Sequence, residues 1–170
     1  MPGKAIGIEL NLGYPGTVAR SVDTIITPKT VSKEETELIK FGDLVVLNKD
    51  NTYSKFKTDN IANDFVGIAI REVKQAIDYY SGSGSYLPGE TCDAINRGTI
   101  TVFCNNGTPI AGGKVFVRIK ENEEIPDGKI GQLEAIADGD NTIEIPNLKW
   151  TTGKIDSNNV AEVTILNRTI

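Results

Sequence analysis

The chain of 170 residues contains no histidine, the side chain that most readily takes up and releases a proton near neutral pH. Ser-His-Asp and Cys-His catalytic arrangements are therefore excluded, as are zinc sites that need a histidine ligand. A pair of carboxylates or a lysine base can still act as a catalyst, but only where burial tunes its pKa. The sequence spacing nominates no such pair, so we expect a protein that is not an enzyme and uses no cofactor.

The two cysteines, Cys92 and Cys104, do not form a metal-binding pattern. Their spacing is not C-x-x-C, and two thiols are too few for a four-ligand zinc site. A disulfide is feasible if the two residues lie on neighbouring strands. Free and partly buried thiols are favoured in a chain made in a reducing cytosol.

The segment Asp138-Gly139-Asp140-Asn141 carries carboxylate and amide oxygens, which are the ligands that calcium prefers. It lacks the later ligands and the terminal glutamate of a calcium loop, and the same residue types are typical of turns. We therefore predict a plain turn and no metal site.

One candidate contact surface is the segment Gly13-Tyr14-Pro15-Gly16. It predicts a tight turn that presents a single aromatic ring, which suits an anchor in a partner's pocket. We take Tyr14, Pro15 and Gly16, with Arg20 nearby, as candidate residues of a protein interface. The turn can equally pack on its own domain, and the sequence does not choose between the two.

A second group of candidates is Tyr79, Tyr80 and Tyr86, which flank a loop of serines and glycines at 81–85. Tyrosine supplies rigid amphipathic area, so these rings can anchor a protein interface or stack on sugar rings. They can equally line one end of their own domain. These alternatives stay open at this point.

The charge balance disfavours two classes of partner. Lys and Arg number 18 against 23 Asp and Glu, which gives a net charge of −5, and nucleic acid is held by the opposite sign. Apolar stretches such as 65–70 fall far short of the ~20 residues that span a bilayer, and residues 1–9 contain no secretory apolar core. We expect a soluble protein without a nucleic-acid or membrane partner.

Composition and periodicity predict an all-β protein. Ile, Val and Thr together number 49, against 20 for Leu, Ala and Met, and β-branched side chains favour strands. Apolar alternation is clear in several segments, including a row formed by Val66, Ile68 and Ile70. Strands are expected at 22–27, 43–48, 53–57, 66–70, 98–104, 114–120, 130–136, 142–145 and 163–165.

Short turn signals separate these strands. Residues 48–51 (NKDN) predict a hairpin, and residues 105–107 (NNG) predict a turn. A helix is considered only at 32–40, where Ser32 and Glu35 have the spacing of a capping box, although a strand suits the segment equally well. We predict an N-terminal arm at 1–20 and one antiparallel β-sandwich, jelly-roll-like domain at 21–170.

Six segments together resemble a known family. In order and spacing, they are similar to the structural cement, or capsid decoration, proteins of tailed bacteriophages. The segments are GYPGTVARS at 13–21, IKFGDLVV at 39–46, FVGIA at 65–69, YLPGE at 86–90, RGTITV at 97–102 and GKVFVR at 113–118.

The resemblance implies a virion protein made in the cytoplasm of a bacterial host. It would bind the outer capsid surface and bridge neighbouring major capsid protein subunits, with a homodimer favoured and a trimer as the alternative. Two other functions are kept open: another β-domain of the virion, in the tail or neck, and a carbohydrate-binding β-sandwich. The latter would stack sugars on the tyrosines or on Trp150.

Overall fold

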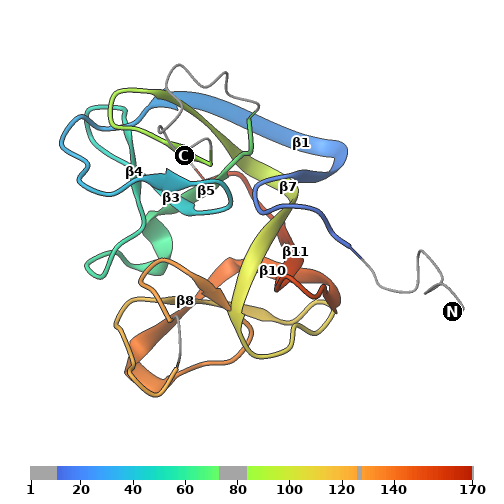
Figure 1. Ribbon diagram of the computed structural model, residues 1–170. Helices are drawn as coiled ribbons and strands as arrows, with labels where there is room; N and C mark the ends of the chain where they lie inside the picture. The colour runs from blue at the N-terminus through green and yellow to red at the C-terminus, as the bar shows by residue number, and fades with distance from the viewer. Residues whose placement is uncertain (1–10, 73–83, 126–127, 170) are drawn as a thin grey trace, which may run out of the picture.

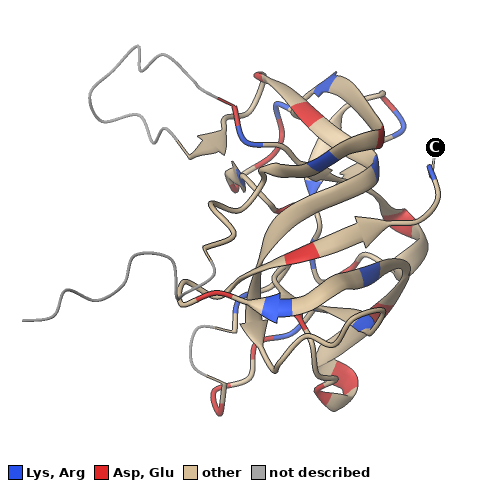
Figure 2. Ribbon diagram, turned by 90° about the vertical axis from the view of Figure 1, so that its right-hand side faces the viewer, with Lys and Arg blue, Asp and Glu red and all other residues tan. Residues whose placement is uncertain are grey.

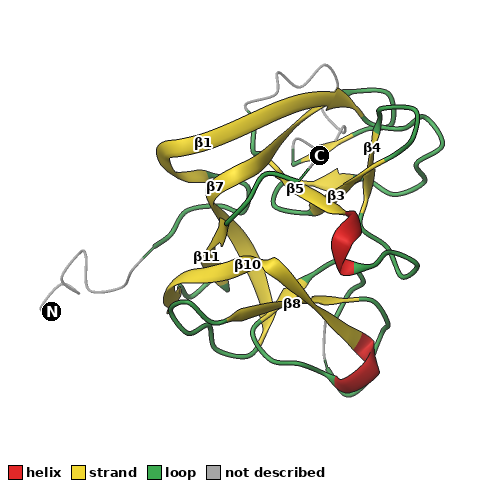
Figure 3. Cartoon of the chain, turned by 180° about the vertical axis from the view of Figure 1, so that it is seen from behind, coloured by secondary structure: helices red, strands yellow, loops and turns green. Residues whose placement is uncertain are grey.

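The computed structural model describes residues 11–72, 84–125 and 128–169. These residues are mainly strands and loops, with two single-turn 3-10 helices (Figures 1 and 3). The elements are β1 (Val18–Thr30), β2 (Ile39–Lys40), β3 (Leu44–Leu47), β4 (Tyr53–Lys55), η1 (Ala62–Asp64), β5 (Phe65–Ala69), β6 (Ser85–Tyr86), β7 (Thr91–Asn106), β8 (Lys114–Arg118), β9 (Leu133–Glu134), η2 (Gly139–Asn141), β10 (Thr142–Ile155) and β11 (Val160–Ile165). The all-β prediction is confirmed.

Five strands close into a barrel, which forms the lower half of the molecule in Figure 1. Strand β7 pairs with β11 on one side and with β9 on the other, and β8 and β10 complete the ring. All these pairings are antiparallel except β7–β9, which is parallel. The expected two-sheet sandwich is thus not confirmed, because this half is one sheet that closes on itself and so buries its edges.

The other half, which we call the upper lobe, is built on the first part of β7. Here β7 pairs with β1 and β5, β5 pairs with β3, and β3 pairs with β4. An isolated parallel bridge between Val31 and Tyr53 connects the end of β1 to β4. Strand β7 is therefore shared by the barrel and the upper lobe.

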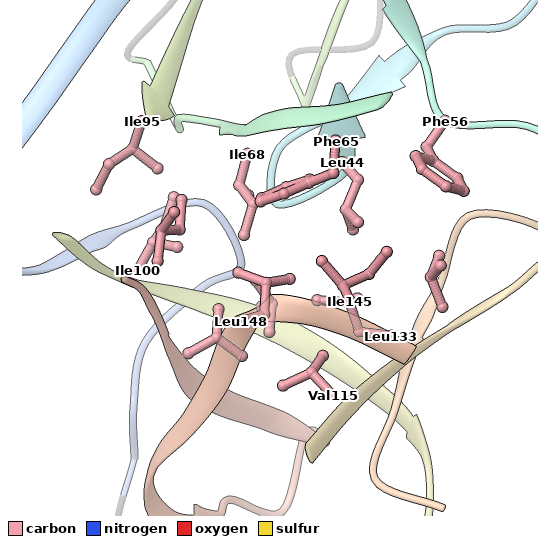
Figure 4. Close-up of a cluster of buried hydrophobic side chains, with 14 of the residues drawn as sticks. Leu44, Phe56, Phe65, Ile68, Ile95, Ile100, Val115, Leu133, Ile145 and Leu148 are labelled. Atoms are coloured by element: carbon pink, nitrogen blue, oxygen red, sulfur yellow. The ribbon is translucent and has the colours of Figure 1, made fainter. Parts of the chain in front are cut away.

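Two hydrophobic clusters fill these halves. The larger one joins the barrel interior to the lower face of β3 and β5, where Leu44 and Ile68 point toward Leu148 and Ile145 (Figure 4). The smaller one lies on the opposite face of the same two strands and includes Val45. Because β3 and β5 contact a core on both faces, all residues of β5 are buried.

The predicted row of Val66, Ile68 and Ile70 is wrong in one respect. Ile68 and Ile70 belong to the larger cluster, whereas Val66 belongs to the smaller one. The register shifts between Val45, which pairs with Gly67, and the next residue of β3, which pairs with Phe65. A β-bulge of this kind inserts one residue and reverses the face on which the following side chains lie.

No α-helix forms at 32–40, where the structure has turns followed by β2. A capping box needs the Ser32 N–H to be available for the Glu35 side chain. That N–H instead donates to the Tyr53 carbonyl at 2.8 Å, and the Glu35 carboxylate accepts from the Lys55 N–H at 3.1 Å. Tertiary hydrogen bonds thus replace the helical ones. Within the described ranges, no helix has the length and apolar composition that crossing a membrane requires.

Other predicted boundaries shift in the structure. Strand β1 begins at Val18, inside the segment expected to be an arm. The predicted strand at 130–136 is reduced to β9, because Gly131 adopts a positive φ of 85° and the Gln132 N–H closes a turn onto the Lys129 carbonyl.

Of the two predicted turns, only the one at 48–51 forms. The hairpin at 48–51 closes where the Asn48 N–H donates to the Thr52 carbonyl at 2.9 Å. The turn predicted at 105–107 is wrong, because Asn105 and Asn106 belong to β7 and the chain bends only at Gly107, which has a φ of 82°. The pairing of this end of β7 with β9 keeps both asparagines in the strand.

Candidate functional site

The turn around Tyr14 is the most exposed aromatic feature of the described chain. Tyr14 is 66% exposed as a residue, whereas its backbone carbonyl accepts hydrogen bonds from the Thr17 hydroxyl at 2.9 Å and the Thr101 hydroxyl at 2.7 Å. The Gly16 N–H also donates to the Thr101 carbonyl at 2.7 Å. The backbone of this turn is therefore fixed to β7, while the aromatic ring faces solvent.

Two glycines bring this turn into close contact with the loop between β2 and β3. Gly16 and Gly42 have φ values of 84° and 89°, a region that favours glycine. A Cβ atom on Gly16 would lie 2.9 Å from the Arg71 nitrogen and 2.9 Å from the Phe41 Cβ, and one on Gly42 would lie 2.9 Å from the Pro15 Cβ. Side chains at either glycine would separate the two loops.

Arg71 completes this surface. Its N–H donates to the Gly16 carbonyl at 2.8 Å, and its guanidinium carbon lies 4.0 Å from the centre of the Tyr14 ring, which is a cation–π distance. A hollow of about 320 Å³ opens beside this pair, and we call it the Tyr14 hollow. It is lined by Tyr14, Pro15, Lys40, Phe41, Arg71 and Gly84.

A second hollow of about 230 Å³ adjoins the first, because Pro15, Lys40 and Phe41 line both. Asp43 lies in its wall, where the carboxylate accepts from the Lys40 N–H at 2.9 Å and the Lys55 ammonium is 3.9 Å away. Burial raises the pKa of Asp43 to about 6, and the positive charge of Lys55 opposes this rise only in part. Part of the Asp43 population thus remains protonated at mildly acidic pH.

The structure does not bring all the predicted contact residues together. Tyr14, Pro15 and Gly16 form one turn, whereas the Arg20 guanidinium lies in β1, 3.6 Å from the Glu162 carboxylate. Tyr86 is fully buried, and its hydroxyl donates to the Ile70 carbonyl at 2.7 Å. Of the alternatives left open for the tyrosines, Tyr86 therefore lines its own domain and does not present a contact surface.

Two predicted contact residues, Tyr79 and Tyr80, lie outside the described residues. Trp150, proposed as a sugar-stacking platform, is 1% exposed. A buried indole cannot stack on a sugar ring in solution, so the carbohydrate-binding alternative loses this residue.

Sequence reasoning missed four residues of the Tyr14 hollow, which are Lys40, Phe41, Arg71 and Gly84. Lys40 ends the two-residue strand β2, Phe41 follows it, and Arg71 comes shortly after β5. Nothing in the spacing of these residues signals their proximity, because hydrogen bonding between separate loops brings them together. The only available signal was the glycine in KFGD at 40–43, which marks a turn.

The turn predicted at 138–141 forms, and the Asn141 N–H donates to the Asp138 carbonyl at 2.9 Å. Asp138 precedes η2, and its carboxylate accepts from the Arg118 guanidinium at 2.9 Å and from the Asn122 amide at 3.0 Å. Hydrogen bonds from Asn122 and Arg118 hold the pKa of Asp138 below its usual range. Among residues 11–72, 84–125 and 128–169, no three potential metal-ligating side chains gather at one point.

The cysteines are free and buried, as predicted. Burial raises the pKa of Cys104 to about 11, so its thiol is protonated at neutral pH and is a poor nucleophile. The surface charges do not form a single-sign face in the view of Figure 2, which shows basic and acidic residues interspersed over both halves.

Comparison with known proteins identifies the family. A model of the XM1 gp53 minor capsid protein family matches residues 3–165, and no curated protein matches the chain. Among solved structures, a chain in the capsid of Myoviridae Phage XM1 is similar with a TM-score of 0.71 at 18% identity, covering 98% of this chain and 97% of that one. The structural likeness concerns the fold. By the family match over nearly its whole length, the chain belongs to the XM1 gp53 minor capsid protein family of structural phage capsid proteins.

Proposed function

We propose that this protein binds the outer surface of a phage head and bridges neighbouring major capsid protein subunits, so that it acts as a cement. The observation that carries this proposal is the family match to a minor capsid protein over residues 3–165. A bridging protein needs rigid contact surfaces more than reactive groups. Its individual contacts can be modest, because many copies on one shell bind at high effective concentration.

The turn at Tyr14 is the proposed contact with the capsid. Its ring is exposed, but its backbone is held by hydrogen bonds to Thr101 and Thr17. A rigid aromatic side chain loses little conformational entropy on binding, which is why tyrosine is common among residues that dominate interface energy. Pro15 and Arg20 extend the proposed contact surface, and Gly16 contributes by allowing the close approach of the loops.

Strand β1 is the proposed surface for self-association. None of its residues is buried, and Val22 and Ile26 are exposed aliphatic side chains on it. It pairs with β7 along one edge, and an edge strand can pair with the same strand of a second copy in an isologous dimer. We propose a homodimer. A mass measurement in solution tests this, and a trimer or a monomer would contradict it.

The proposed function is tested with heads that were assembled without this protein. Purified protein is mixed with these heads, and the bound copies are counted after sedimentation. Saturation at a fixed number of copies per head is expected, as is greater resistance of decorated heads to heating. Binding to isolated tails or necks instead of heads would contradict the proposal and favour the alternative virion location.

The substitution Tyr14→Ala should weaken head binding by about 2 kcal/mol, which is roughly 30-fold, because it removes the exposed aromatic anchor. The melting temperature of the free protein should hardly change, since the ring is mostly in solvent. Ile110→Ala is the matched control, because Ile110 is also an exposed apolar residue. Equal affinity of Tyr14→Ala and wild type would remove Tyr14 from the contact surface.

A further inference from the structure

We infer that the Tyr14 hollow recognises an acidic segment of the neighbouring capsid polypeptide, in which a carboxylate stands next to an apolar side chain. This inference rests on the proposed function, because it specifies the chemistry of the partner at the same surface. Three features of the described residues carry it: the apolar lining of the hollow, the two cations on its rim, and the pairing of Asp43 in the adjoining hollow with Lys55.

The floor of the hollow is apolar and rigid. Pro15 and Phe41 line it, and the Phe41 ring packs edge-on against Tyr86 with ring centres 5.4 Å apart. The Phe41 N–H donates to the Gly84 carbonyl at 3.1 Å. A preformed apolar surface of this kind favours an apolar side chain of a partner, because little ordering is needed on binding.

The rim carries two exposed cations, Lys40 and Arg71. Among residues 11–72, 84–125 and 128–169, no carboxylate oxygen forms an ion pair within 4.0 Å of either cation. Arg71 instead stacks on Tyr14, a contact that leaves the N–H groups at the guanidinium edge available to donate hydrogen bonds to a carboxylate. Two such cations form a local positive site on a protein whose net charge is −5.

Asp43 lines the adjoining hollow and not the Tyr14 hollow. Its side chain is only 17% exposed, its carboxylate accepts from the Lys40 backbone N–H, and the Lys55 ammonium lies 3.9 Å away. The charge of Lys55 opposes the burial-induced rise in the pKa of Asp43 more than the charge of Lys40 does. A carboxylate from a partner would therefore complement both cations without competing with an internal ion pair. Charge complementarity at an interface favours such a partner and fixes its register.

The test compares two double variants that change the net charge equally. Lys40→Glu with Arg71→Glu reverses the charge of the rim. Lys49→Glu with Lys154→Glu reverses the charge of two exposed lysines that do not line the Tyr14 hollow. Binding to heads lacking this protein is measured at two salt concentrations. The rim variant should bind roughly 10- to 100-fold more weakly, and the control should stay within about threefold of wild type.

A neutral variant, Lys40→Gln with Arg71→Gln, guards against a folding defect caused by the new negative charges. It should show an intermediate loss of affinity and a weaker dependence on salt than wild type. Equal losses in the rim and control variants, or no loss in either, would overturn the inference while wild-type binding upholds the proposed function. Failure of the wild type itself to bind heads would instead contradict the proposed function.

A second measurement identifies the partner segment directly. A photo-crosslinking phenylalanine analogue is placed at position 14, and the crosslinked capsid peptide is sequenced from decorated heads. We expect Asp or Glu within a few residues of the crosslinked site, beside an apolar residue. A crosslinked segment that is basic, or that lacks acidic residues, would overturn the inference.

Discussion

At the scale of single residues, the contact between the two glycine turns determines the shape of the surface at Tyr14. A Cβ atom at position 16 would lie 2.9 Å from the Arg71 nitrogen and 2.9 Å from the Phe41 Cβ, which is closer than Cβ atoms approach other atoms in proteins. The turn can therefore approach the loop at Gly42 only while both positions lack side chains. The rigid presentation of the Tyr14 ring follows from this close packing.

The substitution Gly16→Ala should destabilise the protein by about 2 kcal/mol or more, because it adds a clash with backbone to the strain of a positive φ. Gly13→Ala is the matched control. Gly13 also has a positive φ, of 91°, but a Cβ atom there meets nothing within 4 Å. Gly13→Ala should therefore lower the free energy of unfolding by only about 1 kcal/mol. Denaturant unfolding measures both, and equal costs would show that the close packing contributes nothing.

The raised pKa of Asp43 predicts that the stability of the protein depends on pH. The pKa of Asp43 is raised by burial from 3.8 to about 6, so the folded protein binds this proton more tightly than the unfolded chain. The free energy of unfolding should therefore fall as the pH rises from about 4 to about 6. At 1.36 kcal/mol per pKa unit, the full effect is ~3 kcal/mol, and we expect about 1 to 3 kcal/mol because the group is partly exposed.

Asp43→Asn removes this titration and retains an oxygen that accepts the Lys40 N–H. It should stabilise the protein by about 1 to 3 kcal/mol at pH 8 and have little effect at pH 3.5. Denaturant unfolding across this pH range provides the measurement. A difference between wild type and variant that does not change with pH would show that Asp43 titrates normally.

At the scale of elements, β8 and β9 are joined by a buried ion pair. The guanidinium of Arg118 donates to the carboxylate of Glu134 at 2.9 Å, and both side chains are fully buried. The hydrogen bond from Arg118 to Glu134 raises the pKa of Arg118, so the arginine remains charged. Asp138 and the Lys120 carbonyl accept its remaining donors.

Removing only one partner of this pair leaves a buried charge without compensation. Arg118→Met should therefore lower the free energy of unfolding by about 3 to 5 kcal/mol. Arg118→Met combined with Glu134→Leu should recover most of that lost stability. The free energies of unfolding of the two single variants and the double variant measure this coupling. A double variant as unstable as Arg118→Met would show that the pair contributes more than charge compensation.

At the scale of the whole molecule, β7 connects the barrel to the upper lobe. Its first residues pair with β1 and β5, and its later residues pair with β11 and β9. The larger hydrophobic cluster also extends across both halves (Figure 4). Neither half can therefore unfold without exposing the core of the other.

We accordingly predict one cooperative unfolding transition. Calorimetric and van't Hoff enthalpies should agree, and circular dichroism and Trp150 fluorescence should report the same midpoint. Trp150 lies in β10 of the barrel and belongs to the larger hydrophobic cluster, so its fluorescence reports on the barrel. A separate early transition seen only by circular dichroism would show that the upper lobe unfolds independently.

The sequence by itself determined the strand content and the absence of histidine chemistry, because these depend on composition and on local alternation. It also identified the Tyr14 turn, since glycine and proline mark tight turns wherever they occur. The hairpin at 48–51 was predictable for the same reason, as its hydrogen bonds join neighbouring residues.

Only the tertiary structure decided which strands close the barrel and which residues surround Tyr14. The missing helix at 32–40, the bulge at Val66 and the burial of Tyr86 all arise from contacts between residues distant in sequence. Lys40 and Arg71 reach the same hollow for that reason as well. Local patterns specify strands and turns, but the pairing of remote segments depends on how they fill a common core, which no short stretch of sequence encodes.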